Sequence, residues 1–240
     1  MKKILVVGCS YSALPIENEY KSWTQFMSEE GYYVDNFAEH GAGNLIIKRI
    51  LQTKLAEKKY DFVIVQWSTI DRWDYPINNH YELTGSNPDG YKKSFYKEYY
   101  NVYASILDTL DNIVSAQLIL EKYNTPYTMI SMGNLFEMEA SVQAMQILAR
   151  HKGDYSKIKI NNLLDTIKLT SNLDTIDGCL KLIDFNKFKF SSIPNNYFGG
   201  GMIEFLLNKG DYPKFKFHYT TEQHKLFYKE FIKPILNDNK

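Results

Sequence analysis

The sequence predicts an α/β protein of three layers (α/β/α), in which about five parallel strands lie between two layers of helices. Two observations predict this class: short, wholly apolar runs, and amphipathic helical segments that alternate with them. Hydrophobic residues make up 44% of the 240 residues, which is enough for one sizeable core. We therefore expect a single domain over residues 1–240, with insertions at approximately 74–93 and 151–215.

The first predicted element is a strand at Lys3–Val7, a continuous apolar run that ends before Gly8. Together with Cys9, this start also resembles a lipoprotein signal, in which a small residue precedes a cysteine. A signal needs an apolar region of ~7–15 residues, whereas only Ile4–Val7 are strongly apolar here. The run therefore favours a strand that is buried on both faces of a parallel sheet.

The later elements are predicted from the same two patterns. In Gly43–Lys58 leucine and isoleucine recur on one helical stripe, and Asp61–Trp67 contains a continuous apolar run. Asp74–Lys93 is rich in Pro, Gly and Asn and predicts a loop, and the weakly periodic range 151–215 predicts a lid or an insertion. The remaining predicted strands are Tyr32–Phe37 and Pro126–Ser131, and the remaining helices are Ser22–Glu30, Phe95–Tyr123, Leu135–Arg150 and Thr220–Leu236.

Composition and charge exclude several classes of function. Lys and Arg total 28, as do Asp and Glu, so no basic surplus points to a nucleic-acid partner. Two cysteines, Cys9 and Cys179, form neither a disulfide framework nor a metal-ligand cluster, so we expect no metal and no cofactor. No segment approaches the ~20 apolar residues of a membrane span. We expect a soluble cytoplasmic protein without a membrane partner, or a virion-associated one if the source is viral; the oligomeric state stays open.

Candidate functional residues follow the predicted strands, because ligands bind at the carboxyl ends of the strands in such sheets. Ser10 follows the first strand, and a serine on a tight turn can expose its hydroxyl as a nucleophile. The glycine-rich segment Gly41–Asn44 follows the second strand and lets backbone N–H groups approach a substrate closely. A nucleophilic serine needs a base, and the candidates are the five histidines of the sequence, His40, His80, His151, His218 and His224. These residue types predict acyl transfer to water.

These segments resemble the blocks of the SGNH (GDSL-like) hydrolases, particularly compact members found among phage and bacterial proteins. Val7–Ser12 resembles the first block, with Ser10 as the nucleophile, and Asn36–Asn44 resembles the second, in which Gly41 matches the glycine that donates its N–H to the oxyanion. His218 and the helix after it are similar to the last block with its catalytic histidine. The resemblance implies a flavodoxin-like fold and a serine esterase that needs no metal.

Two departures from the family pattern concern the third and last blocks. The third block normally contains an asparagine that donates to the oxyanion, whereas Gln66–Arg72 contains none. That role would pass to Asn44, Ser68 or Arg72, or be missing. In the last block an aspartate normally precedes the histidine by three residues, but position 215 is phenylalanine, so Asp211 is the candidate acid.

The functional prediction is hydrolysis of a small acyl ester, with a carbohydrate O-acetyl group as the favoured substrate. The alternative is an inactive SGNH-like module that binds glycans or serves as a structural or virion-associated accessory. Ser10 has a second interpretation as a helix N-cap, and His224 is interpreted as a surface or capping residue. Aromatic residues would line a sugar-binding groove or belong to the core; they are Trp67, Trp73, Tyr75, Tyr91, Tyr96, Tyr99 and Tyr100.

Overall fold

The structure, a computed structural model, describes residues 1–16, 20–70, 72, 74–77, 80–83, 102–135, 174–192, 198–210 and 219–239. Their central feature is a parallel sheet of four strands in the order β2-β1-β3-β6. Counted among themselves along the chain, these strands follow the order 2-1-3-4 of flavodoxin-like sheets. The sheet consists of β1 (Lys3–Val7), β2 (Tyr33–Asn36), β3 (Phe62–Trp67) and β6 (Tyr127–Ser131).

The predicted fold class is confirmed, with a difference in the number of strands. The described residues form four parallel strands rather than five. On the outer side of β6, Phe188 makes a single parallel bridge to Met129, and the N–H of Lys189 donates to the Met129 carbonyl at 2.9 Å. One residue therefore occupies the place where a fifth strand would pair.

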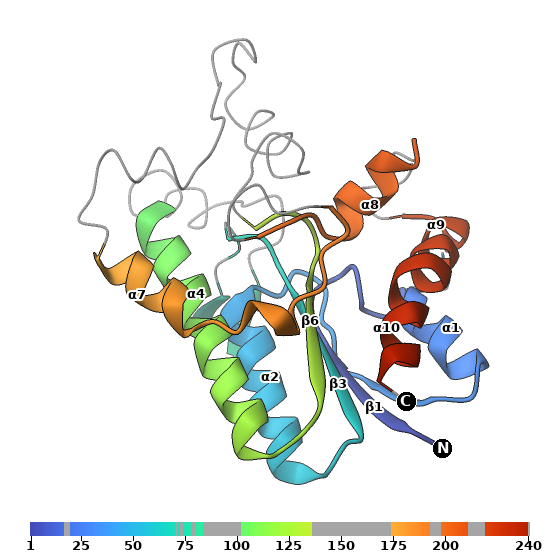
Figure 1. The fold of residues 1–240 in the computed structure, drawn as a ribbon, viewed down its shortest axis with the longest axis horizontal. Helices are drawn as coiled ribbons and strands as arrows, with labels where there is room; N and C mark the ends of the chain where they lie inside the picture. Colours follow the sequence, from blue (N-terminus) through green and yellow to red (C-terminus); the bar gives the residue numbers. More distant parts are fainter. Residues whose placement is uncertain are drawn as a thin grey trace.

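Helices cover both faces of the sheet (Figure 1). α2, α4 and α7 cover one face, and α1, α8, α9 and α10 cover the other. The alternation along β1 explains the apolar run: Leu5 and Val7 face the first helical layer, whereas Ile4 and Val6 face the second. The helices are α1 (Trp23–Glu29), α2 (Asn44–Glu57), α4 (Val102–Lys122), α7 (Asp174–Leu182), α8 (Met202–Asn208), α9 (Thr221–Phe227) and α10 (Lys233–Asp238).

The last predicted helix is continuous but not uniform. Between α9 and α10 the chain forms a π-helical segment, η3 (Tyr228–Ile232). Pro234 lies at the start of α10 and has no N–H to donate to a carbonyl of the preceding turn. A wider helical turn before the proline accommodates that missing hydrogen bond.

Two predicted irregular segments contain regular structure. Asp74–Ile77 (β4) and His80–Leu83 (β5) form an antiparallel pair within the segment predicted as a loop. Within 151–215, α7 and α8 contribute buried residues to the two faces of the core, and η2 (Phe185–Lys187) is a 3-10 turn. The short length of these elements concealed their periodicity. Of the predicted helix Leu135–Arg150 only Leu135 is described, and the start of Phe95–Tyr123 lies outside the described residues.

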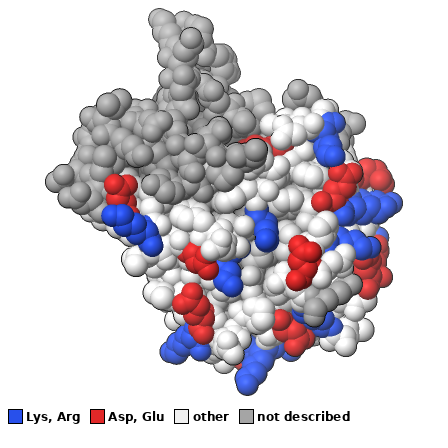
Figure 2. Space-filling view, viewed as in Figure 1, with Lys and Arg blue, Asp and Glu red and all other residues white. Residues whose placement is uncertain are grey.

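In the described part of the face shown in Figure 2, positive and negative side chains are interspersed. Exposed ion pairs join Lys209 to Glu230 at 2.6 Å and Lys233 to Glu30 at 2.8 Å. Among the described helices, none is both long and apolar enough to cross a membrane.

Candidate functional site

Ser10 lies in a tight turn directly after β1. The N–H groups of Ser12 and Ala13 both donate to the Cys9 carbonyl, at 2.9 and 3.1 Å. Ser10 is 4% exposed, and neither its hydroxyl nor its N–H has a hydrogen-bond partner in the described part of the chain. The interpretation of Ser10 as a helix N-cap is wrong, because α1 is capped by Ser22 and no described helix begins at the turn.

Three elements hold this turn in place. The Ser12 hydroxyl donates to Gln66 Oε1 on β3, and the Ser12 carbonyl accepts from Asn36 Nδ2 at 2.7 Å. On the α1 side, Trp23 Nε1 donates to the Tyr11 carbonyl at 3.0 Å. β1 pairs with β3 up to its last residue, so Ser10 lies beside the point where the strand order reverses.

The second turn lies between β2 and α2 and depends on two glycines. Gly41 has a φ of +82°, a conformation that favours glycine, and its N–H has no acceptor among the described residues. Gly43 is the N-cap of α2 but supplies no side-chain cap. Instead, Asp74 accepts from the N–H groups of Gly43 and Ile46, both at 2.7 Å. A residue beyond β3 therefore caps this helix.

Asn44 joins the start of α2 to the end of β3. Its Oδ1 accepts from the Ser68 N–H at 2.8 Å. Its Nδ2 lies 3.3 Å from the Ser68 carbonyl and 3.1 Å from Thr109 Oγ1. Both N–H groups of the amide thus point at protein acceptors, and neither is left for a substrate oxygen in this arrangement.

Ser68 and Arg72, the other two candidate donors, are less committed. The Ser68 hydroxyl is buried and has no hydrogen-bond partner in the described structure. The guanidinium of the half-buried Arg72 makes one long hydrogen bond, from Nη1 to the Ala42 carbonyl at 3.5 Å, and no other among the described residues. A guanidinium has five N–H donors, so most of its capacity is unused.

The two ends of the chain meet beside this site. Tyr219, which follows His218 in the sequence and is 2% exposed, packs edge to face against Tyr11 at a ring distance of 5.6 Å. Burial chiefly raises the pKa of Tyr11 well above its ordinary value, and Tyr219 adds to this effect, whereas the positive charge of Arg72 opposes it. His218 and Asp211 themselves lie outside the described residues.

His224 is not on the surface, and that part of its interpretation is wrong. It is 1% exposed, its Nδ1 accepts from the Trp23 N–H at 3.3 Å, and its ring stacks on Tyr20 at 5.0 Å. The histidine holds the start of α1 against α9. Its place in the closing helix did not reveal this contact, because the partner residues come from the other end of the chain.

Of the aromatic residues considered for a sugar groove, Trp67 belongs to the core. It is fully buried on β3, and its Nε1 donates to Met129 Sδ at 3.4 Å. The side chains of Trp73, Tyr75, Tyr91, Tyr96, Tyr99 and Tyr100 lie outside the described structure.

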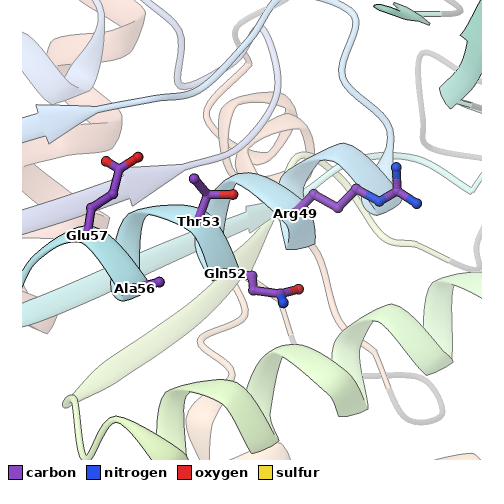
Figure 3. A pocket seen from close by; sticks show the side chains of 5 residues that line it. All are labelled: Arg49, Gln52, Thr53, Ala56 and Glu57. Carbon is purple, nitrogen blue, oxygen red and sulfur yellow. The ribbon is translucent and has the colours of Figure 1, made fainter. Parts of the chain in front are cut away.

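Two hollows lined by described residues lie away from Ser10. One follows the outer face of α2 (Figure 3), and its lining residues Arg49, Gln52, Thr53, Ala56 and Glu57 all come from that helix. The other lies between α1 and the α9–η3 segment, beside Phe26 and Tyr228. Neither contains the residues of the two turns, so we place the candidate site by its chemistry rather than by these hollows.

Sequence reasoning missed Asp74 and Gln66 as residues of the site. The sequence places Asp74 in a predicted loop. The available signal is an acidic residue shortly after the third strand, together with a helix that begins without a capping side chain of its own. Gln66 stands out in the sequence only as part of the divergent third block. Its Nε2 is buried without an acceptor in the described structure, while its Oε1 accepts from Ser12.

The buried Asp74 predicts a pH dependence of stability. Burial raises the pKa of Asp74 above 3.8, while the N–H groups of Ile46 and Gly43 and the charge of Arg72 oppose the rise. A carboxyl whose pKa is higher in the folded chain stabilises the fold fully below its unfolded pKa and loses this contribution as the pH rises through the folded pKa. We expect the free energy of unfolding of the wild type, relative to Asp74→Asn, to fall from about pH 3.8 upward. Urea denaturation across this range measures the difference, and an increase with pH would contradict the expectation.

Comparisons in sequence and in structure gave different results. No sequence-family profile matches the chain, and no curated protein matches it in sequence. In structure it is similar to the esterase EstA from Pseudoalteromonas sp., at 12% identity and a TM-score of 0.50, over 99% of this chain and 100% of the other. It is also similar to the acetyl xylan esterase AlAXEase, at 11% identity and a TM-score of 0.51, over 97% and 99% of the two chains.

A third similar structure is a catalytic mutant of Axe2, an acetylxylan esterase from Geobacillus stearothermophilus. The identity is 15% and the TM-score 0.51, over 98% of this chain and 94% of that one. At these identities the likeness concerns the fold. The chain shares the α/β fold of these esterases.

Proposed function

We propose that the protein is a serine ester hydrolase in which Ser10 is the nucleophile. The observation that carries the proposal is the position of Ser10 at the carboxyl end of β1, beside β3, with its hydroxyl unused in the described structure. In an open α/β sheet, ligands bind at the carboxyl ends of the strands where the strand order reverses, which is the position of Ser10. The esterase fold of the chain supports the same assignment.

In the proposed reaction Ser10 Oγ forms a bond to the ester carbonyl carbon while its proton passes to His218. The N–H groups of Ser10 and Gly41, which have no acceptor in the described chain, hold the oxyanion. The carbon–oxygen bond of the ester then breaks, and His218 returns the proton to the leaving alcohol. Water releases the acyl group by the same steps. No metal or cofactor takes part.

The contact between Tyr11 and Tyr219 supports His218 as the base. These two tyrosines follow Ser10 and His218 in the chain, and their rings pack at 5.6 Å. Asp211 is the proposed acid that orients the histidine. The family's usual aspartate position, 215, is a phenylalanine here. This departure is compatible with activity, because a serine and a histidine retain part of the catalysis when the acid is lost.

Ser68 and Arg72 are the proposed supplementary contacts to the oxyanion or the substrate. The buried Ser68 hydroxyl has no partner in the described structure, and Arg72 uses only one of its donors there. Asn44 contributes only if its amide leaves the Ser68 carbonyl and Thr109. The two uncommitted residues therefore fit the role better than Asn44.

We propose a small acyl ester as the substrate, with an O-acetyl group on a carbohydrate as the favoured case. Two of the structurally similar proteins are acetyl xylan esterases, which supports this substrate class. The assay is acetate release from acetylated xylo-oligosaccharides, compared with p-nitrophenyl acetate. Release from neither substrate would contradict the substrate class.

Covalent trapping tests the nucleophile directly. A p-nitrophenyl alkylphosphonate should react with Ser10 Oγ, releasing p-nitrophenolate and leaving a phosphonylated serine, because its phosphoryl oxygen occupies the oxyanion site. Mass spectrometry of the digested protein should locate the added mass on the peptide that contains Ser10. Labelling that is absent, or that occurs equally in denatured protein, would contradict the assignment.

The second candidate function is an inactive module of the same fold that binds glycans or serves an accessory role. The hydrogen bonds of Asn44 to Ser68 and Thr109 favour this candidate, because they occupy one predicted oxyanion donor within the protein. This candidate predicts no phosphonate labelling of Ser10 together with measurable binding of an acetylated oligosaccharide by calorimetry.

A further inference from the structure

The chain beyond β3 makes backbone contact with the turn that carries Gly41. A Cβ added at Gly43 would lie 2.6 Å from the Arg72 carbonyl oxygen and 2.9 Å from both carboxylate oxygens of Asp74. Such distances are too short for any side chain, so the two segments touch at a position that only glycine permits. Arg72 and Asp74 are therefore packed against the turn as one unit.

Asp74 makes the strongest polar contacts of this unit. It is 1% exposed, and each of its oxygens accepts from one backbone N–H of the first turn of α2, Gly43 and Ile46, at 2.7 Å. Such bonds to an ionised carboxylate are shorter and stronger than those between neutral groups. The positive end of the helix dipole adds to them. Both oxygens are engaged in the helix cap, so this role is fully built in the structure.

The cap determines where Gly41 and Arg72 lie. Gly41 precedes the capped residue Gly43 by two positions, and the buried Ala42 between them accepts from Arg72 Nη1 at 3.5 Å. Arg72 itself precedes Asp74 by two positions and touches Gly43 through its carbonyl. Two groups proposed to face the substrate, the Gly41 N–H and the Arg72 guanidinium, are thus anchored by the same carboxylate.

We propose that Asp74 is a positioning residue for the ester hydrolysis proposed above, on which this inference rests. It contacts no substrate and acts through Gly43, holding the Gly41 N–H and Arg72 at the distances that the oxyanion requires. Oxyanion donors act on the transition state, and displacement by about 1 Å costs up to about 100-fold in rate. Loss of the Asp74 cap should therefore lower kcat more than it raises KM.

The test replaces one carboxylate oxygen. In Asp74→Asn the amide NH2 cannot accept from a backbone N–H, so one of the two bonds is lost while the shape is kept. We expect kcat for p-nitrophenyl acetate to fall about 10- to 100-fold, with KM changed by less than about threefold. Asp74→Glu keeps both acceptors and should restore part of kcat. All assays are made at least about 10 °C below the measured Tm of each variant.

Asp184→Asn is the matched control. The Asp184 carboxylate also caps a turn, accepting from the Asn186 N–H at 3.0 Å, but at η2, away from the two turns. This control should keep wild-type kcat. Amide hydrogen exchange of Gly43 and Ile46, followed by NMR, should accelerate in Asp74→Asn and stay unchanged in Asp184→Asn. This second readout does not depend on catalysis.

The outcomes separate the two proposals. Faster exchange of Gly43 and Ile46 in Asp74→Asn together with a wild-type kcat would show that the cap is purely structural, and would overturn the positioning role. Unchanged exchange of these amides would also overturn it. Equal background rates in the wild type and Ser10→Ala would overturn the proposed function, and the positioning role with it, independently of any Asp74 variant. Faster exchange, lowered kcat and partial recovery in Asp74→Glu together support the proposal.

Discussion

Ser10→Ala is expected to lower kcat/KM for p-nitrophenyl acetate at least about a thousandfold, since loss of the nucleophile in serine hydrolases costs that much or more. The variant removes one oxygen atom that bonds to nothing in the described structure. Its free energy of unfolding should therefore change little. A loss of activity without a loss of stability is the result that distinguishes a nucleophile from a structural serine.

Ser12→Ala is the matched control for this substitution. Ser12 lies two residues further along the same turn and is also buried, but its hydroxyl donates to Gln66 Oε1. Its removal should destabilise the fold by about 1 kcal/mol and retain at least about a tenth of the activity, because the hydroxyl has no chemical role. Equal losses in both variants would contradict the assignment of Ser10 and point to a disturbed turn.

Gly201→Ala is expected to destabilise the protein by about 3 kcal/mol, at the upper end of the usual range for overpacking. The added Cβ would lie 2.2 Å from the Ser131 carbonyl oxygen and 2.8 Å from the Gly133 nitrogen. These are backbone atoms at the carboxyl end of β6, and they cannot move aside as a flexible side chain would. The strand end and the start of α8 would have to separate.

The matched control is Gly178→Ala, within α7. A Cβ at Gly178 meets no atom within 4 Å, and alanine in a helix interior is favoured over glycine by about 0.5–1 kcal/mol. The two variants carry the same chemical change and should shift the free energy of unfolding in opposite directions, as measured by urea denaturation. Destabilisation of both by similar amounts would contradict the predicted close approach at Gly201.

The elements with strong local patterns were predictable from the sequence. The apolar runs at Lys3–Val7 and Asp61–Trp67 form β1 and β3, and the leucine–isoleucine stripe of Gly43–Lys58 forms α2. Short elements inside irregular segments, such as β4 and α8, were not predicted. A strand of 4 residues or a helix of 7 residues is too short to show a recognisable periodicity. Their burial comes from partners that are distant in sequence.

By itself the sequence determined the fold class and the order of the main strands and helices, and it led to Ser10 and Gly41 as candidate residues whose roles remain proposals. The tertiary structure alone decided that Asp74 caps α2, that Asn44 is bonded to Ser68, and that His224 is buried against Trp23. The physical reason is the range of the interactions. Apolar periodicity is read within a window of neighbouring residues, whereas a polar side chain can bond wherever the fold brings a donor or an acceptor.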